Sequence, residues 1–391
     1  MRTLLINWEQ RDLGDITEKI GSGKTPRGGS SSYSEKGVIF LRSQNIHSNK
    51  VDFSNIVYID NHMDYEMANS RVQQGDVLLN ITGASIGRSA VYNSNESANV
   101  NQHVCIIRPS DKISSEYIQL CLVSFDGQKK IEAYQAGGGR EGLNFKQISE
   151  MTFIIPFENE QKQIGEFFQK LDHTITLHQR KHDLLKKLKQ GYLQQMFPVK
   201  NEVVPQLRFS GFKDDWGQSK FKNIIIRVNK SSNSNKLPKI EFEDISAGEG
   251  RLNKDISKKF DTRKGIEFEP NDILYGKLRP YLKNWLMPNF KGIALGDFWI
   301  FRSTNNISNF VYNLIQTNKY QKAANDTSGT KMPRSDWKKV SETMFFISKN
   351  LEEQQKIGEF FQKLDQDLSL QQLKIEQLQQ LKQAYLQKLF P

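Results

Sequence analysis

The nine residues Ile164-Gly165-Glu166-Phe167-Phe168-Gln169-Lys170-Leu171-Asp172 recur without a change at positions 357–365. The two copies are 193 positions apart in a chain of 391 residues, which indicates a chain of two halves. The correspondence extends to the end of each copy, because residues 190–198 align with residues 383–391. The segments before the copies differ far more. A repeated helical part with divergent globular parts indicates one pseudo-symmetric frame that presents two different surfaces.

From Glu160 onward, apolar residues recur at alternating spacings of four and three, which is the heptad pattern of a coiled coil. In the first half this seam comprises Ile164, Phe168, Leu171, Ile175, His178, His182, Leu185, Lys189, Tyr192 and Met196. In the second half it comprises Ile357, Phe361, Leu364, Leu368, Gln371, Ile375, Leu378, Lys382, Tyr385 and Leu389. Both copies end in Phe-Pro, and proline stops a helix. We expect two helices of about 35 residues, each roughly 50 Å long.

These two helices can pair antiparallel and hold two globular domains at opposite ends of a stiff spacer. The alternative is two ordinary bundle helices in separate cores. The matching length, register and terminator of the two seams favour the pair.

The globular parts have the mixed pattern of α/β domains. In the first half, strands are predicted over residues 38–41, 76–81, 104–109 and 151–155, with a helix over residues 114–125. In the second half, Trp216 and residues 271–274 match Trp8 and residues 75–78, which indicates a shared fold. We therefore predict an α+β fold in which two α/β domains are separated and joined by two long helices packed as an antiparallel coiled coil. The expected boundaries are 1–157, 158–198, 199–350 and 351–391.

Composition favours a polyanionic partner. The chain has 55 Lys and Arg against 44 Asp and Glu, a formal net charge of +11 and a pI near 9.3. Such a balance is typical of proteins that bind nucleic acid. Two cysteines in apolar runs, Cys105 and Cys121, are too few for a disulfide framework and fit a reducing cytosol. Residues 1–10 lack the apolar core of a signal peptide, and no run of 18 apolar residues occurs, so we expect a soluble cytoplasmic protein without a membrane span.

Residues 21–25 have the sequence Gly-Ser-Gly-Lys-Thr, which resembles part of a phosphate-binding loop. The complete motif needs a glycine where Glu18 stands, and no clear helix follows. We interpret the segment as a flexible turn whose Lys24 and Arg27 can reach DNA phosphates.

His178 and His182 are four residues apart and could bind a metal from one helix face, with His173 nearby. In the second copy Gln371 and Ile375 occupy the two equivalent seam positions. We therefore favour polar residues that set the helix register over a metal site.

Motifs for nuclease and amino-methyltransferase chemistry are missing. No Pro-Asp dipeptide occurs, Glu160-Gln161-Lys162 falls on the long helix, and no Asn-Pro-Pro-Tyr or Asn-Pro-Pro-Phe is present. We do not expect this chain to catalyse a reaction.

Loops beside the predicted strands are rich in residues that contact bases and phosphates. Asn and Gln can pair with adenine, Arg and Lys can pair with guanine, and glycines let the backbone approach closely. In the first half the candidates are Lys24, Arg27, Arg42, Gln44, Asn45, Ser85, Arg88, Asn101, Gln102 and Arg140. In the second half they are Lys277, Arg279, Tyr281, Lys283, Thr330, Lys331 and Arg334. The alternative is that these loops are solvated turns of a basic protein.

Taken in order, these segments resemble the DNA-specificity subunit of a type I restriction-modification system over nearly the whole chain. The resemblance rests on Pro156-Phe-Glu-Asn-Glu-Gln-Lys-Gln-Ile164 and Leu351-Glu-Glu-Gln-Gln-Lys-Ile357, which open the two long helices. It also rests on residues 82–87, 101–104 and 277–281, which are similar to parts of the family's target-recognition domains. The second copy departs from the pattern at Ser348, near the place of Pro156.

The resemblance implies a non-catalytic adaptor. Each recognition domain would recognise one half of a bipartite, non-palindromic site in double-stranded DNA, and the helices would set the gap. Two methyltransferase subunits, which use S-adenosylmethionine on adenine, would dock on the helices, and two restriction subunits would add ATP- and Mg²⁺-dependent translocation and cleavage. This chain would bind no cofactor or metal itself. The predicted docking residues are Ile164, Phe167, Phe168, Leu171, Ile357, Phe360, Phe361 and Leu364.

Two other functions stay open at this stage. The chain could be a self-contained nuclease or NTPase, against which the missing motifs count. It could also be a coiled-coil scaffold that binds only protein partners, against which the basic balance and the loop composition count.

Overall fold

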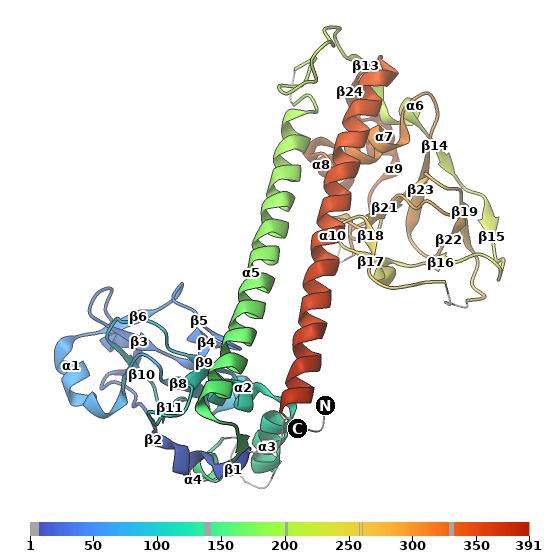
Figure 1. The fold of residues 1–391 in the computed structure, drawn as a ribbon. Coiled ribbons are helices and arrows are strands. Elements are labelled where there is room, and N and C mark those ends of the chain that lie inside the picture. Colours follow the sequence, from blue (N-terminus) through green and yellow to red (C-terminus); the bar gives the residue numbers. More distant parts are fainter. Residues whose placement is uncertain are drawn as a thin grey trace. The chain divides into compact units, whose positions relative to one another are not determined.

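The computed structural model describes residues 8–136, 142–199, 202–257, 259, 261–327 and 332–390 (Figure 1). The chain forms two compact units. Unit 1 consists of residues 1–176 and 376–391, and unit 2 consists of residues 177–375. Each unit thus contains one globular domain and part of both long helices. The expected α+β architecture is confirmed, whereas the four predicted boundaries stay predictions.

Unit 1 contains two four-stranded sheets. The first has the order β2-β11-β8-β9 and is antiparallel; the second has the order β6-β3-β10-β7, with β10 parallel to β3. The strands are β2 (Thr17–Ser22), β3 (Val38–Leu41), β6 (Val57–Ile59), β7 (Arg71–Val72), β8 (Val77–Asn80), β9 (Ser89–Val91), β10 (Ala98–Val100) and β11 (Val104–Pro109). Two further pairs are β1 (Glu9–Asp12) with β12 (Thr152–Ile155), and β4 (Ile46–His47) with β5 (Lys50–Val51). The helices are α1 (Asn61–Glu66), α2 (Ser115–Val123), α3 (Phe125–Ala136) and α4 (Phe145–Ser149).

The apolar runs of β8 and β11 form strands because both faces of the sheet are covered. Cys105 and Ile107 pack into a core with α2, while Val104 and Ile106 pack into a second core against the other sheet. Successive side chains of a strand point to opposite faces, so a continuous apolar run fills both cores.

Unit 2 repeats this plan with different residues. Its sheets have the orders β14-β23-β20-β21 and β15-β19-β22-β16, and β16 is parallel to β22. The strands are β14 (Ile225–Val228), β15 (Ser231–Ser232), β16 (Lys239–Ile240), β19 (Gly265–Phe268), β20 (Ile273–Gly276), β21 (Trp285–Leu286), β22 (Gly292–Ala294) and β23 (Phe298–Ser303). Further pairs are β13 (Gly217–Lys220) with β24 (Met344–Ile347), and β17 (Ile245–Ser246) with β18 (Arg251–Leu252). The helices are α6 (Phe221–Ile224), α7 (Ser308–Leu314), α8 (Asn318–Asn325) and α9 (Trp337–Glu342).

An ion pair to a buried aspartate occurs in both domains and shows that they are equivalent. Arg108 on β11 donates two hydrogen bonds of 2.8 Å to Asp76, and Arg302 on β23 donates two of 2.7 Å to Asp272. Each aspartate precedes the central strand of its sheet. The match between residues 75–78 and 271–274 therefore marks the same structural position in both units.

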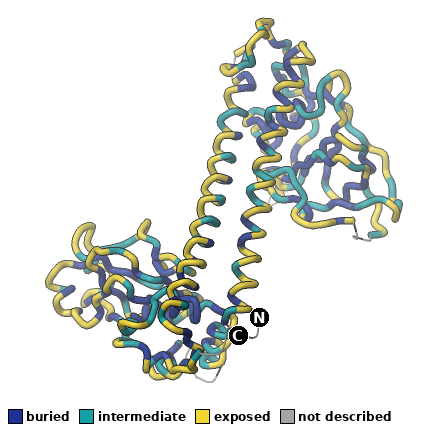
Figure 2. Tube along the Cα trace, in the orientation of Figure 1, coloured by how far each residue is buried: buried dark blue, intermediate teal, exposed yellow. Residues whose placement is uncertain are grey.

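The two long helices are α5 (Glu158–Gln195) and α10 (Leu351–Leu389), slightly longer than expected. In unit 1, Lys382 on α10 contacts Asp172 on α5 at 2.6 Å. In unit 2, Lys189 on α5 contacts Asp365 on α10 at 2.6 Å. Within each unit the helices run antiparallel, and buried and exposed positions alternate along them (Figure 2). The lysines that interrupt both seams therefore pair with the aspartate that ends the nine-residue repeat.

The glycine of the repeat is required by close packing of each long helix on its own domain. A Cβ atom on Gly165 would lie 2.9 Å from Cβ of Glu116 on α2, and one on Gly358 would lie 2.7 Å from Cβ of Asn309 on α7. Real Cβ atoms do not approach so closely. The repeated block thus fixes how α5 packs on α2 and α10 packs on α7.

Two local predictions need correction. The helix expected over residues 114–125 is two helices, because Ser124 ends α2 and its Oγ accepts a hydrogen bond from Gly127 N at 3.0 Å at the start of α3. Residues 21 and 22 belong to β2, so the turn predicted for residues 21–25 begins only after Ser22.

Candidate nucleic-acid interface

Three loops of unit 1 meet at one edge of its sheets. One loop follows β2, the second follows β8, and the third connects β10 to β11. Gly23 N donates to Asn101 O at 3.2 Å, and Thr82 forms an isolated β-bridge with Gly142 before α4. A Cβ atom on Gly23 would lie 1.5 Å from Val100 O, so only glycine permits this contact.

A chain of polar side chains connects these loops. Thr25 Oγ1 donates to Gln102 Oε1 at 2.6 Å, and Gln102 Nε2 lies 3.0 Å from His103 Nε2. His103 Nδ1 lies 2.5 Å from Thr82 Oγ1. The Gln102 amide donates to Nε2, so His103 carries its proton on Nδ1 and donates to Thr82. We call Thr25, Thr82, Gln102 and His103 the histidine cluster.

The histidine cluster presents an amide in a fixed orientation at the surface. Gln102 is exposed, and its side chain keeps one N–H and one oxygen lone pair that the cluster does not use. An adenine edge requires such a donor and acceptor side by side. The arrangement can therefore recognise a base.

Unit 2 has a cluster at the equivalent place. Lys277 N donates to Asp297 O at 2.8 Å, and Leu278 forms an isolated β-bridge with Arg334 before α9. Asp297 carboxylate oxygens lie 2.6 Å from Arg334 Nη2 and 3.8 Å from Lys277 Nζ. We call Lys277, Asp297 and Arg334 the aspartate cluster. Asp297 lies between β22 and β23, as His103 lies between β10 and β11, so the same frame carries different chemistry in the two units.

The loop after β20 also has unusual backbone geometry. Arg279 and Lys283 have φ angles of 49° and 56°, which only a few per cent of residues other than glycine adopt. Arg279 N donates to Pro333 O at 2.7 Å and holds this turn in place. Tyr281, at the tip of the turn, is 55% exposed.

The structure separates the remaining predicted contacts by exposure. The exposed candidates are Lys24, Arg27, Gln44, Arg88, Gln102, Arg279, Tyr281, Lys283 and Arg334. The half-buried candidates are Arg42, Ser85, Asn101 and Lys277. Arg140, Thr330 and Lys331 lie outside the described residues. Base contact by each of these residues stays a prediction.

Asn45 has a structural role. It is 2% exposed, its Oδ1 accepts from Arg42 N at 3.0 Å, and its Nδ2 donates to Asp52 O at 3.1 Å. Arg42 in turn donates to Asn55 O at 2.9 Å. These bonds hold the loop from residue 42 to residue 55, within which Gln44 remains exposed.

Burial sets the chemistry of ionisable groups beneath the loops. Burial raises the pKa of the Cys105 thiol to about 12, so this side chain stays neutral in the core. Hydrogen bonding to Asp76 raises the pKa of Arg108.

In the described part of the chain, no group of three or more His, Cys, Asp or Glu side chains could hold a metal ion. None of the described helices is long and apolar enough to span a membrane.

Most predicted docking residues form core contacts. Ile164, Phe168, Leu171, Ile357, Phe361 and Leu364 are buried. Phe167 is 40% exposed and packs edge-to-face on Tyr385, and partly exposed Phe360 packs in the same way on Tyr192. Among the eight predicted residues, these two phenylalanines therefore offer the exposed surface.

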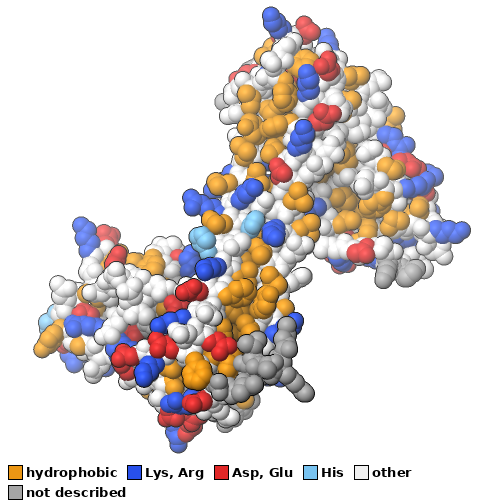
Figure 3. Space-filling view, in the orientation of Figure 1, with side chains coloured by type: hydrophobic (Ala, Val, Ile, Leu, Met, Phe, Trp, Pro, Cys, Tyr) orange, Lys and Arg blue, Asp and Glu red, His pale blue; other side chains and the backbone are white. Residues whose placement is uncertain are grey.

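Exposed leucines that were not among the predicted docking residues lie on the long helices. They are Leu177, Leu184, Leu188, Leu351, Leu370, Leu373 and Leu381. Apolar side chains gather over both helices in Figure 3. In the sequence these leucines are recognisable as apolar residues at helix positions outside the heptad seam. A search for the seam alone does not find them.

Comparison with known proteins finds similarity to type I restriction enzymes. Residues 6–187 match the model of the type I restriction modification DNA specificity domain. The chain is 24% identical over 241 residues to a protein of Methanocaldococcus jannaschii that is provisionally named the type I restriction enzyme MjaX specificity subunit; the match covers 58% of this chain and 56% of that protein. It is 26% identical over 129 residues to the type I restriction enzyme EcoBI specificity subunit of Escherichia coli, covering 33% of this chain and 27% of that one. The aligned regions thus span about half or less of these curated relatives.

Solved structures show the same fold. The specificity subunit of a type I restriction-modification system from M. genitalium matches with a TM-score of 0.63 and 15% identity, covering 99% of this chain and 96% of that one. A chain from a study of complex assembly and conformational transition of the type I system matches with a TM-score of 0.55 and 15% identity, covering 98% and 97%. Residues 6–187 therefore match a type I restriction modification DNA specificity domain, and the chain has the fold of these solved structures along its length.

Proposed function

We propose that this chain is the DNA-recognition subunit of a type I restriction-modification complex, in which each unit recognises one half of a bipartite, non-palindromic site. The observation that carries the proposal is that one loop frame occurs twice with different side chains. The histidine cluster presents a neutral amide, whereas the aspartate cluster presents cations around a carboxylate. Different donors and acceptors recognise different bases, so the two half-sites should differ.

In this proposal the long helices set the distance between the half-sites. The Lys382–Asp172 pair in unit 1 and the Lys189–Asp365 pair in unit 2 fix the register of α5 against α10. A fixed spacer determines half-site separation geometrically, as dimer spacing does for other DNA-binding proteins.

The helices also dock two methyltransferase subunits in this proposal, and two restriction subunits join the complex. Exposed apolar side chains on a helix favour a protein partner, because such patches are uncommon on surfaces that face only water. Phe167 and Phe360 occupy equivalent positions in the repeat, so each could contact one of two identical partners. S-adenosylmethionine and ATP with Mg²⁺ would be bound by the partner subunits, and this chain would catalyse no reaction.

Fluorescence anisotropy with a labelled DNA duplex tests the central part of this proposal. Phosphate contacts release counterions, so the affinity of the chain, alone or with its methyltransferase subunits, should fall steeply between 50 and 200 mM salt, conditions over which several phosphate contacts cost on the order of a thousandfold. An affinity that stays flat over this range would favour the alternative of a scaffold that binds only protein.

A further inference from the structure

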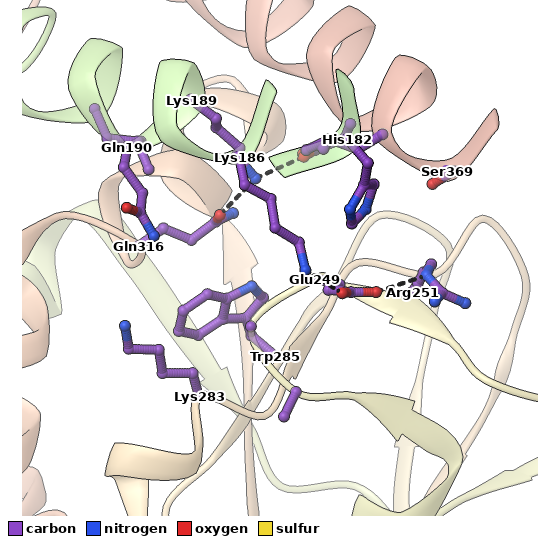
Figure 4. A pocket seen from close by; sticks show the side chains of 15 residues that line it. His182, Lys186, Lys189, Gln190, Glu249, Arg251, Lys283, Trp285, Gln316 and Ser369 are labelled. Carbon is purple, nitrogen blue, oxygen red and sulfur yellow. Dashed lines mark hydrogen bonds and ion pairs between the residues drawn. The ribbon is translucent and has the colours of Figure 1, made fainter. Parts of the chain in front are cut away.

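Unit 2 contains a cavity of about 280 Å³ where α5 and α10 meet the loops around β18 and β21 (Figure 4). Lys186 and Lys189 line it from α5, Arg251 lines it from β18, and Glu249 and Lys283 line it from the loops. The cavity lies apart from the aspartate cluster, none of whose members lines it.

The side chains around the cavity carry an excess of positive charge. Glu249 accepts from Lys186 at 2.6 Å and from Arg251 at 2.8 Å, and Asp365 accepts from Lys189 at 2.6 Å. These two carboxylates are shared among three cations. Lys283 is a fourth cation at the cavity, and none of the ion pairs found among the described residues includes it. The cavity therefore favours an anion.

Two buried polar atoms at the cavity are unsatisfied. Trp285 is 4% exposed and His182 is 3% exposed, and neither Trp285 Nε1 nor His182 Nδ1 has a hydrogen-bond partner among the described residues. The Asp183 carboxylate lies 3.7 Å from His182 Nδ1, beyond hydrogen-bond distance, whereas Trp285 Nε1 makes no polar contact among these residues. Both rings line the cavity (Figure 4). An indole N–H can only donate, and a buried donor without an acceptor is unfavourable. The missing partner is therefore a group that accepts hydrogen bonds.

The repeat shows that the lining is not required by the helix pair. The Lys189–Asp365 pair recurs as Lys382–Asp172 in unit 1. In contrast, the other copy of the helix has Ile375 where His182 stands and Gln379 where Lys186 stands. The imidazole and the added cation occur in one copy only, as expected for a ligand site rather than for a part of the spacer.

We propose that this cavity binds a small phosphate-bearing anion. Its volume is slightly below the range of about 300–1,000 Å³ typical of pockets for drug-sized ligands, so the occupant is a small anion such as inorganic phosphate. Phosphate offers several acceptor oxygens, which suit the Trp285 donor and the ammonium groups of Lys186 and Lys283. The deep burial of Trp285 and His182 favours a free anion over a phosphate of the DNA backbone. This inference does not depend on the proposed DNA recognition.

Isothermal titration calorimetry of the full chain with inorganic phosphate, in buffers matched in ionic strength with chloride, tests the proposal. One saturable site is expected. Trp285→Phe removes the donor and keeps an aromatic ring, and Lys186→Gln introduces the residue of the equivalent position 379. Each should weaken phosphate binding about tenfold, the usual effect of losing a hydrogen bond to a charged group. Lys187→Gln changes an exposed neighbour and should bind phosphate as the unmodified chain does.

A second readout separates the occupant from its alternatives. The indole N–H resonance that disappears in Trp285→Phe should shift when phosphate is added to the unmodified chain, and a short DNA duplex should leave it unmoved. Absence of heat beyond the chloride control, or equal phosphate affinity in Trp285→Phe and Lys187→Gln, overturns the proposal. A shift of the indole resonance on addition of the duplex would assign the cavity to a DNA phosphate and would overturn the proposal of a free anion. If Lys186→Gln lowers the melting temperature of the phosphate-free chain, its weaker binding could reflect a damaged fold. The phosphate affinity of Trp285→Phe and the shift of the indole resonance then decide whether the cavity binds phosphate.

Discussion

His178 Nδ1 lies 2.7 Å from Gln371 Oε1, and the two residues occupy equivalent positions of the repeat, 193 residues apart. In an antiparallel pair of equivalent helices, a residue and its own counterpart lie opposite each other only at the centre of the pair. This pair therefore marks the centre of the α5–α10 register. Because the oxygen of Gln371 accepts, His178 donates from Nδ1, and a metal ion is not needed to explain its place in the seam.

The central position suggests a direct test of the spacer. Insertion of one heptad after His178 and one after Gln371 should widen the gap between half-sites by about three base pairs, since seven residues add roughly 10 Å to each helix. The contacts on either side of the insertion keep their partners, and the half-site bases should not change. Methylation-site mapping measures both quantities. Altered bases with a constant gap would contradict the spacer model.

Substitution in one cluster should change one half-site. Gln102→Ala removes the exposed amide of the histidine cluster and should relax discrimination at one base of one half-site, by about 1–3 kcal/mol in binding free energy. Arg334→Ala should act only on the other half-site. Anisotropy with duplexes that carry single base changes measures both effects. Loss of discrimination in both half-sites from either variant would contradict separate recognition by the two units.

Asn45 and its neighbour Gln44 should behave differently although both were predicted to contact DNA. Asn45→Ala removes buried hydrogen bonds to the backbone and should lower the free energy of unfolding by about 1–3 kcal/mol. Gln44→Ala changes an exposed side chain and should alter the free energy of unfolding by less than about 0.5 kcal/mol. Urea denaturation measures both. Equal stability of the two variants would contradict the structural role of Asn45.

Loss of Lys189 should strongly destabilise unit 2. Lys189 and Asp365 form a largely buried pair, and burial raises the pKa of Asp365 although Lys189 opposes this shift. Lys189→Ala would leave a buried carboxylate without its cation, which typically costs about 3–5 kcal/mol. Lys187→Ala on the exposed side of α5 serves as the control. Guanidinium unfolding curves that coincide for the two variants would contradict this packing.

Stability at low pH should depend on Glu342. Hydrogen bonds from Lys220 and Lys222 lower the pKa of Glu342 to about 2. A carboxylate with a lowered pKa stabilises the fold above its unfolded pKa, and that contribution disappears as pH falls from about 4.5 towards 2. The difference in melting temperature between the unmodified chain and Glu342→Gln should therefore shrink over this range. A difference that stays constant down to pH 2 would show that the pairs add no stability.

Local sequence predicted the long helices and central strands well. The heptad spacing predicted both helices, the Phe-Pro pairs predicted where they end, and the strand over residues 38–41 matches β3. In these segments the apolar period itself specifies the structure. The break at Ser124 was missed because apolar residues continue on both sides of it. The extended backbone of Ser124 ends α2, and its Oγ caps the start of α3.

The candidate site was less predictable, since its contacts join residues far apart in the sequence. The bonds from Thr25 to Gln102 and from His103 to Thr82 depend on sheet topology, which no local pattern encodes. For the same reason the sequence did not show that Asn45 is buried and that its hydrogen bonds go to its own loop. The paired role of Lys189 and Lys382 became clear only when the antiparallel register placed them beside Asp365 and Asp172.

Genome-wide adenine methylation tests the central claim most directly, measured in cells that carry the cognate methyltransferase subunit with and without this chain. The account predicts a two-part, non-palindromic motif with a fixed gap that appears only when the chain is present. If the two proteins co-purify but no bipartite motif appears, or if the same motif is methylated without the chain, DNA recognition by this subunit is contradicted.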